Sequence, residues 1–209
     1  MNKNLLKHSR SLALHLFIRQ IILMVVFLLL GATVLYMGSN TLTWIGAILF
    51  PIGLWVFIFA EANNQGERDQ TFTRTVRRRQ EREPGYTLDD EDQGKIYHPA
   101  KGFIAGFLSN LLGLALALLA LIPADGLATV IIPANRFWNS AYLSVFNLMD
   151  QAQMEILPWL YLAFYGCIGL SAGIGYLAGK QYSDKLDRLN QQRKKQDANA
   201  VRTPEGKLQ

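Results

Sequence analysis

The stretch IILMVVFLLLGATVLYM at residues 21–37 is followed, after the short link GSNT at residues 38–41, by LTWIGAILFPIGLWVFIFA at residues 42–60. A membrane core about 30 Å thick is crossed by about 20 apolar residues of helix. Neither stretch contains a charged residue. We therefore expect two membrane-spanning helices joined by a tight turn, which makes them an antiparallel hairpin.

Two further uncharged apolar stretches, residues 102–122 and 157–178, are long enough to cross a membrane. Together the four stretches predict an all-α integral membrane protein with four transmembrane helices in two antiparallel hairpins. The first stretch is slightly short, but the apolar residues 12–17 allow its helix to begin earlier. A cleaved signal peptide is disfavoured because the second stretch follows the first after only a short link.

Lysine and arginine are confined almost entirely to three parts of the chain. Of the 21, four lie before the first apolar stretch, eight between the second and third and eight after the fourth, whereas the segment between the third and fourth contains only Arg136. Because basic segments resist translocation, the rich parts and both termini are expected in the cytoplasm, and the short loops favour a bacterial inner membrane protein. The expected parts are a cytoplasmic basic N-terminus (1–20), a first transmembrane hairpin (21–60), a cytoplasmic charged loop (61–101), a second hairpin (102–178) with the external segment 123–157, and a cytoplasmic basic tail (179–209).

The external segment contains an amphipathic pattern. Its apolar residues recur at helical spacing: Trp138, Ala141, Tyr142, Val145, Leu148 and Met149. The pattern predicts a helix over Asn135–Asp150, with Asn135 as its N-cap after Pro133. We expect this helix to lie flat on the outer membrane surface, because Trp and Tyr favour the headgroup layer. The alternative is a short soluble loop helix packed on the spans.

The cytoplasmic parts are predicted to be largely helical near the membrane. Residues 61–82 contain no proline and should continue the second span until Pro84-Gly85. Residues 86–98 are expected to be an ordered turn or a flexible link, and the segment 86–101 is the first place to look for a cytoplasmic functional site. The tail should begin as a helix and be disordered over residues 191–209.

Small residues line one face of the third and of the fourth span. They are Gly102, Gly106, Asn110 and Gly113 in the third, and Gly169, Gly173, Gly175 and Gly179 in the fourth. Such faces let helix backbones approach closely in lipid. We expect the two spans to pack against each other, or one of them to pack against a second copy of the chain.

Asn110 is a polar residue inside the third span. A buried amide in hydrocarbon needs a hydrogen-bond partner, so Asn110 is either a link between helices or part of a polar path with Ser109 and Ser171. No Asp, Glu, Lys, Arg or His lies inside any span. Since ion-coupled transporters usually have one, an autonomous secondary transporter is disfavoured.

No catalytic, cofactor or metal residues are predicted. Residues 169–173 match the hydrolase pattern G-x-S-x-G, but they lie within a span, and no histidine lies in any span to act as a base. An EF-hand beginning at Asp89 fails because Ala100 stands where a glutamate is required. The single cysteine, Cys167, permits no internal disulfide. We therefore expect a protein that is not an enzyme.

A basic cluster follows the second span, and its members are Arg74, Arg77, Arg78, Arg79 and Arg82. It is expected to contact anionic lipids of the inner leaflet or, alternatively, an acidic cytosolic protein. The net charge of +5 comes from the cytoplasmic segments, so no nucleic-acid partner is implied.

The leading functional hypothesis is an accessory, scaffold or assembly subunit of a membrane complex, whose partners are the lipid bilayer and another membrane protein or a second copy of the chain. The alternative is an oligomeric pore or transport subunit in which Ser109, Asn110 and Ser171 line the path. The two differ in the expected effect of Asn110→Leu. A packing role predicts loss of assembly, and a transport role predicts loss of flux with assembly intact.

Overall fold

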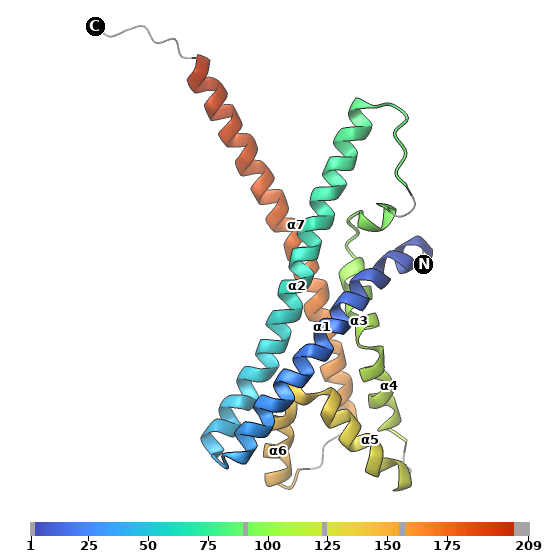
Figure 1. Ribbon diagram of the computed structural model, residues 1–209, viewed down its shortest axis with the longest axis vertical. Helices are drawn as coiled ribbons and strands as arrows, with labels where there is room; N and C mark the ends of the chain where they lie inside the picture. Colours follow the sequence, from blue (N-terminus) through green and yellow to red (C-terminus); the bar gives the residue numbers. More distant parts are fainter. Residues whose placement is uncertain (1–2, 90–91, 123–124, 155–157, 203–209) are drawn as a thin grey trace, which may run out of the picture.

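The computed structural model describes residues 3–89, 92–122, 125–154 and 158–202, and every regular element in these ranges is a helix (Figure 1). Three of the helices are long and apolar enough to cross a membrane, and one bent pair makes a fourth candidate span. The elements are α1 (Lys3–Tyr36), α2 (Asn40–Arg82), η1 (Asp92–Lys95), α3 (Lys101–Ser109), α4 (Leu111–Leu119), α5 (Asp125–Trp138), η2 (Ser140–Tyr142), α6 (Leu143–Gln151) and α7 (Pro158–Arg202).

The turn between α1 and α2 is as short as the sequence predicts. Gly38 adopts a φ of 63°, which glycine reaches without strain, and the Ser39 hydroxyl accepts a hydrogen bond from the Leu42 N–H at 3.5 Å. At its other end α1 begins well before residue 21, as the apolar residues 12–17 allow. Leu12 and Leu16 are buried in the bundle.

Helices α2 and α7 are the longest elements, and they cross each other before their upper ends diverge (Figure 1). Helix α2 ends at Arg82, just before Pro84-Gly85, as predicted. Helix α7 continues to Arg202, so the prediction of disorder from residue 191 is wrong over the described part of the tail. Residues 191–202 are rich in Gln, Lys, Arg and Ala, and these residues extend a helix that packing has already nucleated.

The third apolar stretch was predicted as one helix over residues 102–122, and this prediction is wrong. It forms α3 and α4, which meet at Asn110 with a bend of 53°. The Asn110 side chain accepts hydrogen bonds from other helices, and the Ser109 hydroxyl donates to the Gly106 carbonyl at 2.9 Å. The Ser109 hydroxyl competes with the backbone for the Gly106 carbonyl, which favours a break in the helix here, and the hydrogen bonds to Asn110 hold the bent pair against α1 and α5.

The segment predicted to be external also differs from its prediction. Instead of one flat helix over Asn135–Asp150, α5 and α6 form a helical hairpin with η2 at its tip, and this hairpin packs against α1, α2 and α4. Pro133 lies inside α5, so Asn135 is in the last turn of that helix and is not an N-cap. Tyr142 and Phe146 are buried by neighbouring helices, which fits the alternative of helices packed on the spans.

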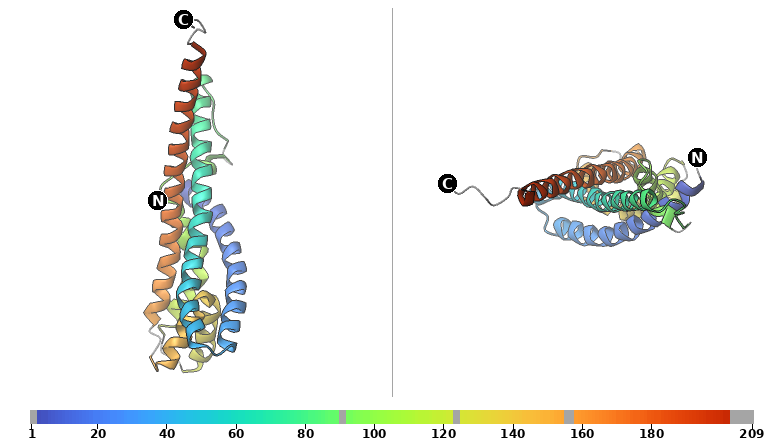
Figure 2. Two further views of the ribbon diagram at one scale, coloured as in Figure 1. Left: turned by 90° about the vertical axis from the view of Figure 1, so that its left-hand side faces the viewer. Right: turned by 90° about the horizontal axis from the view of Figure 1, so that it is seen from above.

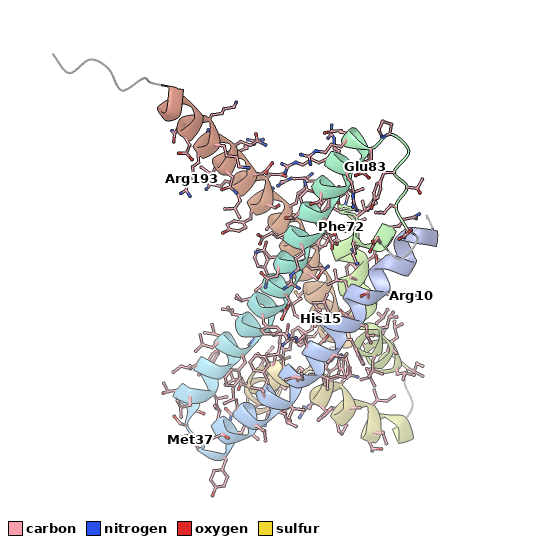
Figure 3. All side chains as sticks on the ribbon, turned by 45° about the horizontal axis from the view of Figure 1, so that its top comes forward. Arg10, His15, Met37, Phe72, Glu83 and Arg193 are labelled. Atoms are coloured by element: carbon pink, nitrogen blue, oxygen red, sulfur yellow. The ribbon has the colours of Figure 1, made fainter. Side chains whose placement is uncertain are left out.

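The molecule is elongated (Figure 2), and its two ends differ in chemistry (Figure 3). In Figure 3 carbon-rich side chains surround the end near Met37, whereas nitrogen and oxygen atoms gather around Glu83 of α2 and Arg193 of α7. This polarity matches the division into apolar spans and charged cytoplasmic extensions that the sequence predicts.

Candidate functional sites

One glycine face of α7 receives aromatic rings from α3. A Cβ atom added at Gly169 or Gly173 would collide with the ring of Phe107 or of Phe103, respectively. The contact is reciprocal, since a Cβ at Gly106 would come within 2.6 Å of the Ala172 methyl group. The third and fourth spans therefore pack against each other, which was one of the two predicted arrangements.

A second glycine face of α7 receives the backbone of α2. A Cβ atom added at Gly175 would overlap the Phe59 carbonyl oxygen, and one at Gly179 would overlap that of Asn63. From the other side, Gly66 of α2 lies against the backbone of Tyr176. Backbones this close gain dispersion contacts that larger residues would prevent, so these glycines hold α2 and α7 together within one chain.

Asn110 is the centre of a buried polar junction between helices. Its Oδ1 accepts a hydrogen bond from Gln20 Nε2 of α1 at 3.2 Å and one from Trp138 Nε1 of α5 at 2.6 Å. Gln20 and Asn110 are each 1% exposed. Gly113, which was predicted as part of the packing face with α7, lies instead beside this junction, against Asn110 and Trp138. Asn110 thus has the geometry of a link between helices.

The two serines of the predicted polar path bond to backbone carbonyl groups. Ser109 donates within its own helix, and Ser171 of α7 donates to the Trp55 carbonyl of α2 at 2.7 Å. Asn110 bonds to α1 and α5 instead. Within the described residues, these hydrogen bonds do not join the three side chains into one path.

A buried charge cluster lies where α2, α3 and α7 meet above the apolar spans. The Asp69 carboxylate of α2 is 2% exposed and accepts hydrogen bonds from the Lys101 ammonium group and, at 2.5 Å, from the Tyr176 hydroxyl. Gln65 Nε2 donates to the other carboxylate oxygen at 2.8 Å. A buried charge requires such partners, so the cluster ties three helices through one carboxylate.

The loop before α3 is fixed to the same cluster. Lys101 Nζ also donates to the Gly94 carbonyl of η1 at 2.7 Å, and the Tyr97 N–H donates to the Thr73 hydroxyl at 2.7 Å. The Tyr97 ring stacks on that of Tyr176, with centroids 5.1 Å apart. Burial, and then the nearby negative charge of Asp184, raise the pKa of the Tyr97 hydroxyl. Residues 94–98 are therefore ordered, which agrees with the ordered turn that was one of the two predicted states of residues 86–98, although residues 90–91 lie outside the described residues.

Sequence reasoning missed the Asp69 cluster. Asp69 and Lys101 are 32 positions apart, and each lies in a segment dense in exposed charges. The sequence pointed only to the segment 86–101 as the first place to look for a functional site. Two members of the cluster and its surroundings, Tyr97 and Lys101, come from that segment. In the described part of the chain no group of three or more His, Cys, Asp or Glu side chains is placed to hold a metal ion.

The arginines after the second span divide into separate roles. Arg74 pairs with Asp184 of α7 and donates to the Ser183 carbonyl at 3.1 Å, while Arg78 pairs with Asp187 at 3.3 Å. These two arginines therefore bind α7 to α2. The others pair along their own helix or face the surface: Arg77 with Glu81 at 3.3 Å, Arg79 with Glu83 at 3.9 Å, and Arg82 in a hollow of about 370 Å³ beside Thr75.

The Arg74–Asp184 pair is electrostatically coupled. Partial burial alone would raise the pKa of the Asp184 carboxyl, but hydrogen bonds from Arg74 and Gln70, together with the charges of Arg74 and Lys180, outweigh this effect. The pKa of Asp184 therefore lies below its ordinary value. The charged form is the one that the folded pair stabilises.

The part of α7 that follows the last apolar stretch also presents an apolar stripe. Tyr182, Leu186 and Leu189 are 52%, 36% and 45% exposed, and their spacing puts them on one side of the helix. Lys185 lies beside the stripe and Arg193 follows it one turn after Leu189, and neither forms an ion pair within the described residues. This surface combines exposed carbon with positive charge.

Comparison of the chain with protein-family models, with curated proteins and with solved structures gave no match.

Proposed function

We propose that this is a four-span protein of the bacterial inner membrane, with both termini in the cytoplasm, that acts by interaction as an accessory, scaffold or assembly subunit of a membrane complex. The observation that supports this function best is the α2–α7 pair. Contacts run along it from Ser171–Trp55, through the glycines at Gly175 and Gly179, to the Arg78–Asp187 ion pair. These contacts hold α2 and α7 together, and both helices extend beyond the apolar stretches with charged ends.

The candidate sites support binding better than catalysis or conduction. The small-residue faces are occupied within the chain, and the buried charges of Asp69 and Lys101 are bonded to each other. What remains open is the diverging, basic end of the pair, where a hollow of about 360 Å³ lies between Arg78 of α2 and Lys194 of α7. A surface of this kind is suited to recognising a partner.

The test is to crosslink the protein lightly in its native membrane, purify it in mild detergent and identify by mass what accompanies it. We expect a stoichiometric partner protein that is lost from a variant with Arg193, Lys194 and Lys195 all changed to Glu. The matched control is Glu81→Gln, an exposed charge change on α2. Recovery of a closed homo-oligomer alone would contradict the proposal.

A second candidate function, an oligomeric transport subunit, is favoured by one observation. The bent span at Asn110 meets the α5–α6 hairpin, and broken helices and packed helical hairpins are the forms that line polar sites in transporters. Gln20 Oε1 and Asn135 Oδ1 are buried there and have no hydrogen-bond partner. Asn110→Leu separates the functions, since a transport role requires loss of flux in a variant that still assembles.

A further inference from the structure

We propose that the exposed stripe Tyr182–Leu186–Leu189 on α7 is the docking site for an amphipathic helix of a cytoplasmic partner protein, and that acidic residues flank the apolar face of that helix. The proposal rests on the proposed function, because it names the kind of partner and gives it a further contact surface at the same end of α7, beside the basic hollow.

The orientation of α7 is fixed by contacts on a different side of the helix. Ser183 is 3% exposed and bonds to Thr71 at 3.2 Å, and the Asp187 carboxylate pairs with Arg78. The stripe residues are not among those that face α2, so they stay exposed while α7 is held in place. Figure 1 shows this part of α7 leading away from the rest of the bundle.

The lipid surface is a poor occupant for the far part of the stripe. The last apolar stretch ends at Ala178, and Leu189 lies eleven residues further on, which is about 16 Å along the helix. The headgroup layer adds only about 5–7 Å beyond the hydrocarbon core. Leu189 therefore extends into water, where an exposed leucine gains by burial against a protein surface.

The positive charges beside the stripe indicate which kind of partner protein could bind there. A helix-in-groove partner buries apolar residues at this spacing and places its polar flanks opposite those of α7. Lys185 and Arg193 would repel the same residues of a second copy aligned in parallel in the membrane, so a homodimer through this face is disfavoured. Glutamate or aspartate flanks would be attracted instead, and the docking should weaken as salt is raised.

The first experiment uses the full-length protein in nanodiscs of uncharged phosphatidylcholine. The probe is a labelled synthetic helix with leucines at heptad a and d positions and glutamates beside them, and its control is a shuffled peptide of the same composition. We expect saturable binding of the probe alone, weakened about tenfold or more by Leu186→Ser with Leu189→Ser. The matched control variant is Gln181→Ser with Gln192→Ser, two exposed positions off the stripe.

The second experiment places a photo-crosslinking amino acid at Leu189 or, as a control on another side of the helix, at Lys195, in native membranes. Support requires a crosslink from position 189 to an acidic amphipathic segment of another protein, with a much lower yield from position 195. Crosslinks to lipid only, to a second copy only, or equally from both positions would overturn the inference.

If the partner copurifies but is retained by Leu186→Ser with Leu189→Ser, this inference fails and the proposed function stands. If no partner protein copurifies at all, the proposed function fails.

Discussion

Asp69 shows how much a single residue can connect in this protein. Its carboxylate is shared by Lys101 and Tyr176 and is buried above the apolar spans. Taking a carboxylate and an ammonium group out of water is costly, and their attraction offsets that cost only while both are present. The cluster is therefore a place where loss of one partner is worse than loss of both.

We predict that Asp69→Asn destabilises the fold by about 3–5 kcal/mol, because it leaves the Lys101 charge buried without a counter-ion. The measurement is the unfolding transition of the purified protein in detergent. Asp69→Leu combined with Lys101→Met removes both charges and should recover much of the loss. Glu81→Gln, at an exposed i,i+4 pair, should stay close to wild type. A single variant as stable as this control would show that the ion pair contributes nothing.

Two glycines of α7 provide a matched pair. Gly179 lies against the Asn63 carbonyl, whereas a Cβ at Gly166 meets nothing within 4 Å. Gly179→Ala must force α7 away from α2, and we expect it to cost about 1–3 kcal/mol in the same unfolding assay. Gly166→Ala should be neutral or slightly stabilising, because alanine favours helix over glycine. Equal effects at the two positions would contradict the close packing of α2 and α7.

At the scale of elements, α2 and α7 are joined, before their ends diverge, by the ion pair between Arg74 and Asp184. Acid should open this pair. Because the folded state lowers the pKa of Asp184, the pair contributes its full stability above the unfolded pKa of about 4 and loses it as the pH falls through the lower folded value. The distance between spin labels at Gln80 and Gln192, in a Cys167→Ser background, should therefore lengthen or broaden below about pH 4. Asp184→Asn should show the widened distribution at every pH, and a wild-type distance that is independent of pH would exclude this role.

The elements that the sequence predicts correctly are those with local causes. The α1–α2 turn depends on Gly38 and Ser39, and the end of α2 depends on Pro84-Gly85, so nearby residues suffice. The bend at Asn110 depends on Gln20, which is 90 positions away, and no local pattern contains that contact. The same limit hid the Asp69 cluster, because a buried charge and a solvated one are identical in sequence.

The amphipathic pattern of residues 135–150 was ambiguous for a related reason. An apolar face on a helix predicts burial, but it does not distinguish the membrane surface from the surface of other helices. In the structure Trp138 reaches Asn110, and Tyr142 accepts a hydrogen bond from Trp55 at 2.7 Å. These long-range partners break the expected helix at η2 and turn it into a hairpin.

At the scale of the whole molecule, the main question raised by the α5–α6 hairpin is the depth that it would reach if the candidate spans cross a membrane. Its tip touches the middle of two candidate spans, since the Ser140 hydroxyl donates to the Met24 carbonyl at 2.8 Å and Tyr142 meets Trp55. Trp55 lies fifteen residues from the start of α2, about 22 Å along that helix. If the long helices cross the bilayer, the hairpin enters from the outer side and ends well inside it, where its backbone groups are protected by protein.

This arrangement predicts a labelling pattern that a flat surface helix could not give. In a helix lying on the membrane, Ser140 would be nearly opposite the apolar stripe and Ser144 would be at its polar edge, so both would be open to water. In the hairpin both are fully buried, while Gln151 at the end of α6 is exposed.

The measurement uses single-cysteine variants made in a Cys167→Ser background and expressed in intact spheroplasts. We expect a membrane-impermeant maleimide, added to the outer side, to label Gln151→Cys rapidly. Ser140→Cys and Ser144→Cys should stay unlabelled until the membrane protein is denatured. Serine and cysteine are close in size, so the substitutions leave the packing largely intact. Labelling of Ser144→Cys as fast as Gln151→Cys would place the segment on the outer surface and rule out its insertion among the spans.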